Sequence, residues 1–231
     1  MKKKSIFVLV FIGAVLSSQM SYAGMVYSND FEGSVGSEWS STTTDITPGT
    51  PSHAADKFLG QFWGSDTVSL TLNNLPSHAE LTVSFDLYII QSWDGNNDAY
   101  GPDIWDLSVS GGPTLLHTTF ANSVGIRTQS YPDSYPNGDY ESRTGAAEND
   151  TLGFTYHSVS FIRDSVYRFY GTESLTFSHS GSSVVLNFSG NIHDVFPNQE
   201  SWGIDNVQVT PEPATILLLT LGGLVLRKNR R

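Results

Sequence analysis

Short runs in which apolar and polar residues alternate recur between residues 68 and 209. Alternation puts every second side chain on one face of a β-strand, so that one face packs on a core and the other meets solvent. Turn-forming Gly, Asn, Asp, Ser and Pro separate the runs at about 8–12 positions, a spacing typical of an antiparallel β-sandwich. The sequence therefore predicts an all-β domain without amphipathic helices, and its clearest predicted strands are 68–72, 81–90, 105–109, 174–178, 184–189 and 203–209.

One internal stretch departs from this pattern. Residues 129–150, QSYPDSYPNGDYESRTGAAEND, are rich in turn-forming residues and tyrosine and show no alternation. Long connections without secondary structure are uncommon in compact domains and are often functional. We expect a long surface loop here.

The N-terminal segment has the features of a secretory signal peptide. Lys2, Lys3 and Lys4 precede an apolar stretch, residues 6–16, and small residues follow up to Ala23, with Ser21 two positions before it. This order predicts cleavage by signal peptidase after Ala23. A retained membrane anchor is the alternative, but the apolar stretch is shorter than the roughly 20 residues that span a bilayer.

The C-terminal segment carries a second hydrophobic signal. Pro211, Glu212 and Pro213 precede an apolar run, residues 214–226, and the chain ends in the basic cluster Arg227, Lys228, Arg230 and Arg231. Such a run predicts a short transmembrane helix whose basic end stays on the cytoplasmic side of the inner membrane. A plain C-terminal anchor would have the same topology.

These three parts, in this order and behind a signal peptide, resemble the PEP-CTERM sorting signal of Gram-negative bacteria. The resemblance covers residues 211–231. It implies processing by exosortase near the PEP motif in a biofilm or exopolysaccharide former. It also implies an inner-membrane-anchored precursor that is released to the cell surface or the extracellular matrix. The expected organisation is a signal peptide, a β-sandwich domain and a sorting signal, at residues 1–23, 24–210 and 211–231.

The charge of the middle segment excludes some partners and favours one metal. Residues 24–210 hold 22 Asp and Glu against five Lys and Arg, a net charge of −17 (5 − 22). Nucleic acid and anionic membrane surfaces are therefore not expected as partners. Cysteine is absent, so disulfides and thiolate metal sites are excluded. Many carboxylates on an exported protein suit calcium, which takes an all-oxygen shell.

Two motifs at opposite ends of the domain nominate a calcium site. The sequence NDFEG, residues 29–33, contains Glu32, and GIDNVQV, residues 203–209, contains Asp205. This pairing resembles extracellular jelly-roll domains such as carbohydrate-binding modules and MAM and concanavalin-like sandwiches. The resemblance implies that Glu32 and Asp205 share a structural calcium ion. A solvated pair or a hydrogen-bonded turn is the alternative for these residues.

A second constellation lies in the stretch SWDGNNDAYGPDIWD, residues 92–106. Asp94, Asn96 and Asp98 have the spacing of a calcium loop, although Ala99 and Trp105 stand where an EF-hand has Gly and Glu. Aromatic faces beside polar groups suit sugars, because a pyranose ring presents C–H groups on one face. The candidate ligand-binding residues are Trp93, Tyr100, Asp103 and Trp105. The alternative is an Asx-rich turn with both tryptophans in the core.

Catalytic motifs are not found. The sequence has no G-x-S-x-G, no H-E-x-x-H and no E-x-D-x-x-E pattern, and its six histidines are scattered singly. We therefore expect a non-enzymatic protein that binds exopolysaccharide with the help of calcium. A structural matrix protein without a specific ligand and a glycan-active enzyme remain the alternatives.

Overall fold

The computed structural model describes residues 24–155, 163–173, 175–193 and 199–212. The predicted signal peptide, Pro213, the apolar run 214–226 and the terminal basic residues lie outside this part. The described elements are β1 (Tyr27–Asn29), β2 (Thr44–Ile46), β3 (Lys57–Phe62), β4 (Thr67–Asn73), β5 (Glu80–Gln91), β6 (Ile104–Val109), β7 (Thr114–Thr119), β8 (Thr128–Gln129), β9 (Tyr140–Glu141), β10 (Glu148–Asn149), β11 (Asp164–Phe169), the 3-10 turn η1 (Gly171–Glu173), β12 (Leu175–Ser178), β13 (Ser183–Asn191) and β14 (Glu200–Glu212).

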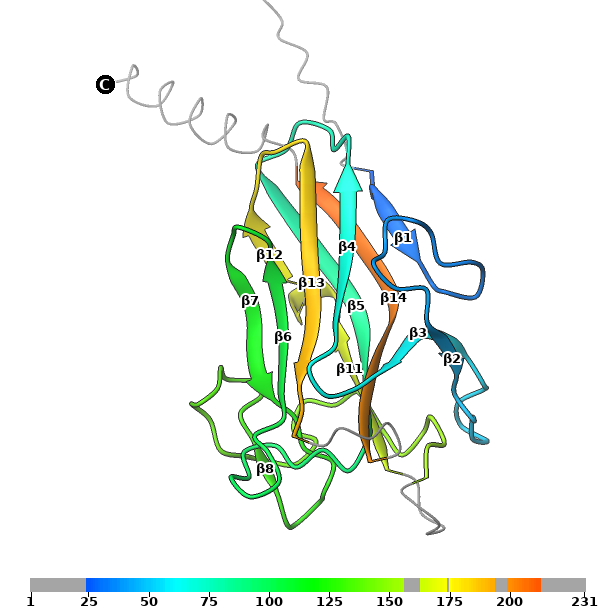
Figure 1. Cartoon of the computed structure of the whole chain (residues 1–231), viewed down its shortest axis with the longest axis vertical. Coiled ribbons are helices and arrows are strands. Elements are labelled where there is room, and N and C mark those ends of the chain that lie inside the picture. The colour runs from blue at the N-terminus through cyan, green and yellow to red at the C-terminus, as the bar shows by residue number, and fades with distance from the viewer. Residues whose placement is uncertain (1–23, 156–162, 174, 194–198, 213–231) are drawn as a thin grey trace, which may run out of the picture.

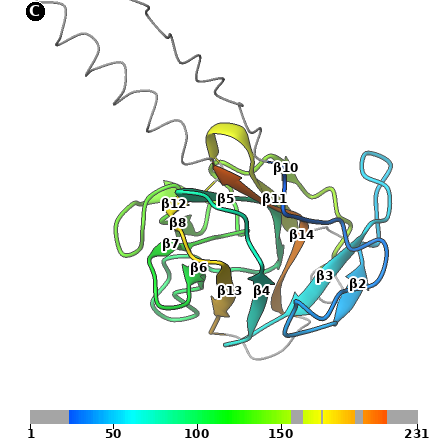
Figure 2. The same ribbon diagram turned by 90° about the horizontal axis from the view of Figure 1, so that it is seen from above.

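Two antiparallel sheets face each other in a sandwich-like arrangement (Figures 1 and 2). The larger sheet has the order β10-β11-β5-β14-β3-β2, with β1 added to β14 and β12 to β5. The smaller sheet has the order β4-β13-β6-β7 and lies in front of it in Figure 1. The all-β prediction is thus confirmed for the described residues.

The main core fills the space between the sheets and is strongly aromatic. Phe85 from β5 lies 5.7 Å from Trp105 of β6 and 5.6 Å from Phe188 of β13, measured between ring centroids. Trp105 in turn meets Trp202 of β14 edge to face at 5.8 Å. Edge-to-face and tilted ring pairs contribute more than their buried area alone. These contacts join the two sheets across the centre of the domain.

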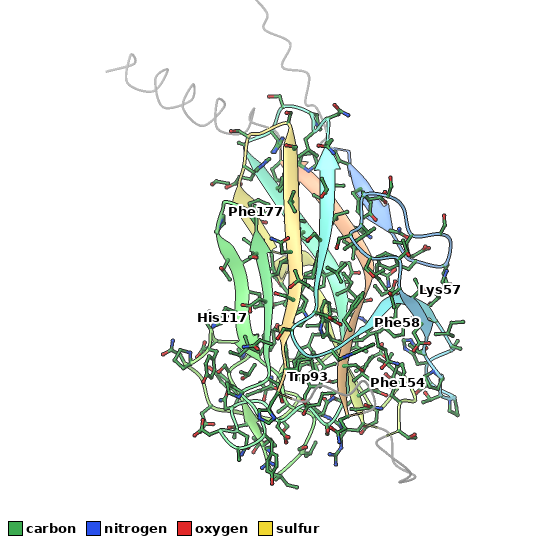
Figure 3. All side chains as sticks on the ribbon, viewed as in Figure 1. Lys57, Phe58, Trp93, His117, Phe154 and Phe177 are labelled. Atoms are coloured by element: carbon green, nitrogen blue, oxygen red, sulfur yellow. The ribbon has the colours of Figure 1, made fainter. Side chains whose placement is uncertain are left out.

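A smaller apolar cluster covers the outer face of the larger sheet. Side chains that alternate with the core positions of β5 point to this face, among them Tyr88 and Ile90, and a segment after β10 covers them. Phe58 and Phe154 meet there at 6.1 Å, and both are labelled in Figure 3. The cluster consists of Phe58, Tyr88, Ile90, Leu152, Phe154 and Val166. The larger sheet is therefore buried on both faces over part of its area, which gives β5 the nearly continuous burial of its second half.

The six predicted strands are all strands in the structure, as β4, β5, β6, β12, β13 and β14. The short or poorly alternating strands β1, β2, β3, β7 and β11 were not predicted. Residues 129–150 contain only two-residue strand pieces, as expected of a loop. However, this segment does not lie wholly on the surface, because Tyr131 packs on Phe120 and Tyr167 at 5.2 Å and closes one end of the core.

The last strand runs past the predicted domain boundary. Pro211 and Glu212 of the sorting motif belong to β14 and pair with Leu81 and Glu80 of β5. The sandwich therefore extends at least to Glu212 rather than ending at residue 210. Among the described residues no helix has the length and apolar character needed to cross a membrane.

Replacing Phe188 by alanine should remove the ring that touches Phe85, Trp105 and Trp39 and leave a cavity between the sheets. A loss of about 3–5 kcal/mol in the free energy of unfolding is expected. Urea denaturation followed by tryptophan fluorescence measures it. The matched control is Ile126→Ala, an apolar side chain that is 72% exposed, for which a change within about 0.5 kcal/mol is expected. Equal effects of the two substitutions would contradict this core.

Candidate metal centre

The pairing of β5 with β14 places two carboxylates directly opposite each other. Asp86 and Asp205 are register partners on the outer face of the larger sheet. Both are buried, with 7% and 1% of their surface exposed. Like charges that face each other across strands destabilise a sheet, and burial away from water increases the cost. The pair therefore needs a proton or a cation in its neighbourhood.

A β-bulge in β14 brings an amide to this pair. The register between β14 and β5 shifts between Asp205 and Gln208, so that β14 holds one residue more than its partner. Asn206 sits in the bulge with a φ of 52°, a left-handed conformation that Asn tolerates better than most residues. Its Nδ2 donates to both Asp86 and Asp205 at 3.1 Å. Asn206 thus binds the two carboxylates together without neutralising either.

Two further carboxyl groups continue the row. Asp56, in the loop before β3, lies near enough to Asp205 and to Glu32 for the pKa values of Asp56 and Glu32 to be shifted by these neighbours. Glu32, in the loop after β1, also accepts a 2.8 Å hydrogen bond from the backbone N–H of Lys57. We call Glu32, Asp56, Asp86 and Asp205 the carboxylate cluster. The two predicted residues, Glu32 and Asp205, each neighbour Asp56, but their oxygens are not among the described ligand atoms that all lie within 4.8 Å of one another.

The electrostatics of the cluster favour a bound proton or cation. Burial, and then the charges of Asp56 and Asp86, raise the pKa of Asp205 to about 8, although hydrogen bonds from Asn206 and Tyr88 oppose the shift. Burial also raises the pKa of Asp86, and burial followed by the contact with Glu32 raises that of Asp56. Hydrogen bonds from the Lys57 backbone and then from Asp56 lower the pKa of Glu32. Neighbouring carboxyl groups repel when all are ionised, so the cluster favours a bound proton or a metal ion.

The nearby cationic side chains compensate little of this charge. Arg168 lies 3.7 Å from Asp86, from Nε to Oδ1, and is also paired with Glu148. Lys57 turns its Nζ to the carbonyl oxygen of Gly33 at 2.6 Å. Carboxylate oxygens are ligands that calcium prefers. The cluster supplies them from two loops and from the paired strands β5 and β14.

A second acidic group lies at the end of the sandwich where the loop after β5 begins. Ligand atoms of Asp94, Asp103 and Glu200 all lie within 4.8 Å of one another. This group already has a cation, because Arg127 donates from Nε to Asp94 at 2.6 Å. Asp103, fully buried, accepts hydrogen bonds from the backbone N–H groups of Asp94 and His193. Burial raises the pKa of Asp103 to about 7. Among the described residues, this is the group of acidic side chains whose ligand atoms lie at mutual distances suited to a metal ion. Arg127 and the backbone N–H groups already bind its oxygens, which also fits an anchor for the loop.

The predicted calcium loop of Asp94, Asn96 and Asp98 is not assembled as its spacing suggested. Asn96 turns its amide oxygen to the hydroxyl groups of Thr119 and Ser130 and its Nδ2 to the carbonyl of Gly138. These bonds fasten the loop to β7 and to the loop after β8. Asp98 is exposed at the loop surface. Asp94 is grouped with Asp103 and Glu200 instead.

The aromatic residues of the same stretch divide between core and surface. Trp93 and Trp105 are fully buried in the main core, so neither offers a ring face to solvent. Trp93 also donates from Nε1 to the carbonyl of Ser201 at 2.9 Å. Tyr100 is 59% exposed, and the guanidinium of Arg127 lies 5.6 Å above its ring. The structure thus places the two tryptophans where the turn interpretation expects them.

Several residues of interest were missed by sequence reasoning. The alternation of residues 81–90 puts Asp86 on the outer face of its strand, so the sequence could have predicted its position. No motif around Asp56 indicates a place in a site. His78 and His179, 101 positions apart, stack with ring centroids 5.0 Å apart and are joined from Nε2 to Nδ1 at 2.7 Å. The scattered positions of these histidines in the sequence gave no sign of this pair.

Comparison of the chain with protein-family models, with curated proteins and with solved structures finds no match. The functional argument therefore depends on the geometry described above.

The protonated state of Asp205 predicts how stability depends on pH without calcium. The unfolded chain loses this proton near the ordinary value of 3.8, whereas the folded chain holds it up to about 8. The folded state binds more protons in this window, so the free energy of unfolding should fall as the pH rises through it. A difference of at least about 1 kcal/mol is expected, because one pKa unit is worth about 1.4 kcal/mol.

Urea denaturation in EDTA at pH 5, 6, 7 and 8 measures this slope, and Asp205→Asn should flatten it. The control Asp139→Asn alters an exposed carboxylate and should leave the slope unchanged. Parallel curves for the wild type and Asp205→Asn would contradict the assignment.

Proposed function

We propose that this protein is an exported, calcium-binding β-sandwich of the jelly-roll type that binds polysaccharide at the cell surface or in the extracellular matrix. The observation that supports it is the carboxylate cluster, in which a buried aspartate pair is linked through Asp56 to the exposed Glu32. An exported domain without disulfides benefits from a cation that only the native state binds.

A calcium ion in this cluster would act on the fold as well as on its charge. Glu32 lies between β1 and β2, Asp56 lies before β3, and Asp205 lies in β14. An ion shared by them would tie two loops to the central strand β14 and offset the repulsion between the carboxyl groups. Glu32 and Asp56 are accessible enough for such an ion to enter, since Glu32 is exposed and Asp56 half-buried.

Localisation is proposed from the two ends of the chain. Signal peptidase would remove residues 1–23, and the tail that follows Glu212 would hold the precursor in the inner membrane until exosortase reads the PEP motif. Release in a biofilm-forming Gram-negative bacterium would place the sandwich among exopolysaccharides.

Calcium should raise the melting temperature of the purified chain relative to the same chain in EDTA. At a free calcium concentration one hundred times the Kd, binding contributes about 2.7 kcal/mol, or about 5–10 °C for a domain of this size. Asp205→Asn and Glu32→Gln should each reduce the shift, and Asp139→Asn, which removes an equal charge elsewhere, should not. Differential scanning fluorimetry at pH 8 gives the comparison. Superimposed melts with calcium and with EDTA would rule out the calcium site.

Polysaccharide binding is tested by a pull-down of the purified chain on the host's own exopolysaccharide, with calcium and with EDTA. Retention that is saturable and stronger with calcium supports the proposal. Absence of retention in both buffers favours a structural matrix protein, and shortening of the polymer during incubation favours a glycan-active enzyme.

A further inference from the structure

An open hollow lies on the larger sheet where β2 pairs with β3. It has a volume of about 380 Å³, which falls in the range of small-molecule sites. Its lining includes Thr44 and Asp45 from β2, Gly60 and Gln61 from β3, Trp63 just beyond β3, and Gln91 at the end of β5. Figure 1 shows β2 and β3 at the side of the sandwich. The hollow shares no lining residue with the carboxylate cluster.

Trp63 is the exposed tryptophan of this chain. Its side chain is 37% exposed, whereas Trp39 is 5% exposed and Trp93, Trp105 and Trp202 are fully buried. A large aromatic ring left at the rim of a polar hollow can stack on the apolar face of a ligand. Because the other four tryptophan rings are buried, Trp63 is the tryptophan that can contact a ligand from solvent.

The polar side chains of the hollow are held in fixed positions. Gln61 donates from Nε2 to Asp45 Oδ2 at 2.7 Å, and its Oε1 accepts a hydrogen bond from the hydroxyl of Ser201 at 2.6 Å. Both ends of the Gln61 amide are thus fixed by protein partners. A preorganised polar wall lowers the entropy lost when a ligand binds.

Gln91 supplies an acceptor that the protein does not use. The residue is only 8% exposed, and its Oε1 has no hydrogen-bond partner in the described structure. Its Nε2 makes one long contact of 3.4 Å to the carbonyl of Thr155. Buried acceptors without a donor are rare in native proteins and call for an explanation. The same oxygen has less than 1 Å² of accessible surface, so a ligand in the open hollow does not reach it, and Gln91 serves as a buried part of the wall.

We propose that this hollow binds a sugar ring of a neutral polysaccharide, with Trp63 stacked on the C–H face of the ring and the fixed side chains of Asp45 and Gln61 beside its hydroxyl groups. The proposal rests on the polysaccharide-binding function proposed above and gives that function a site. Asp45 in the wall and the acidic charge of the domain disfavour an anionic polymer. The open shape admits a chain that continues beyond the bound residue.

The test uses the purified chain in calcium buffer with three soluble neutral glycans, namely a β-glucan, an α-glucan and a galactomannan, and with alginate as the anionic comparison. Isothermal titration calorimetry gives the affinity. Acrylamide quenching of tryptophan fluorescence gives the location, because Trp63 dominates the accessible emission. Binding in the hollow should lower the quenching constant.

Three variants separate a binding role from a structural one. Trp63→Ala should weaken binding at least tenfold, and Trp63→Tyr should retain part of it. Gln91→Leu should leave binding nearly unchanged, because a ligand does not reach its Oε1, and should leave the melting temperature unchanged or raised, since it removes a buried acceptor without a partner. The matched control is Ile126→Ala, which removes another exposed apolar side chain and should bind as the wild type does.

The outcomes distinguish this inference from the function on which it rests. Neutral-glycan binding that Trp63→Ala abolishes supports the hollow. Wild-type affinity in Trp63→Ala, or a loss seen only in Tyr100→Ala, overturns the hollow and leaves polysaccharide binding intact. Binding to alginate alone overturns the neutral ligand. If none of the neutral glycans binds, the inference fails, and the pull-down on the host's exopolysaccharide decides separately whether the proposed function fails with it.

Discussion

β5 and β14 are hydrogen-bonded along nearly their whole length in the middle of the larger sheet, and this pairing sets Asp86 against Asp205. The inward side chains of both strands supply the centre of the core, so the register cannot slip by one residue without turning that apolar set to the outside. The opposed carboxylates are therefore fixed by the hydrophobic core behind them. The repulsion between Asp86 and Asp205 on the outer face of the sheet is thus a consequence of the packing on its inner face.

The bulge at Asn206 determines both which side chains of β14 face the core and which side chains face Asp86. Ile204, Val207 and Val209 are all fully buried in the main core, although their numbers change from even to odd. A regular strand would have turned one part of this set to solvent, and the extra residue corrects the phase. The same irregularity presents Asp205 and Asn206 side by side to Asp86. Core packing and the geometry of the candidate metal centre thus share one local cause.

The outer face of the larger sheet carries both features of functional interest. The carboxylate cluster lies where the loops before β2 and β3 meet β14, and the hollow with Trp63 lies beside the pairing of β2 with β3. β3 contributes to both features. The backbone N–H of its first residue, Lys57, donates to Glu32, and Gln61 lines the hollow, where it is hydrogen-bonded to Asp45. A cation that orders the loop before β3 would also support the strand on which the hollow is built.

The sequence by itself determined the class of fold and the six strands with clean alternation, because a period of two follows directly from strand geometry. It also nominated Glu32 and Asp205 as a calcium site through a resemblance of two short motifs. It did not determine the partners of these residues. Asp56 and Asp86 were not predicted as part of the cluster but lie beside Asp205 in the structure. Asp94 was predicted to act with Asn96 and Asp98 but lies with Asp103 and Glu200. Strand register and loop packing cause these differences, because they bring together residues far apart in the chain. Trp63 and Trp93 are alike as residues, and only the tertiary structure decided that one lies at a rim and the other in the core.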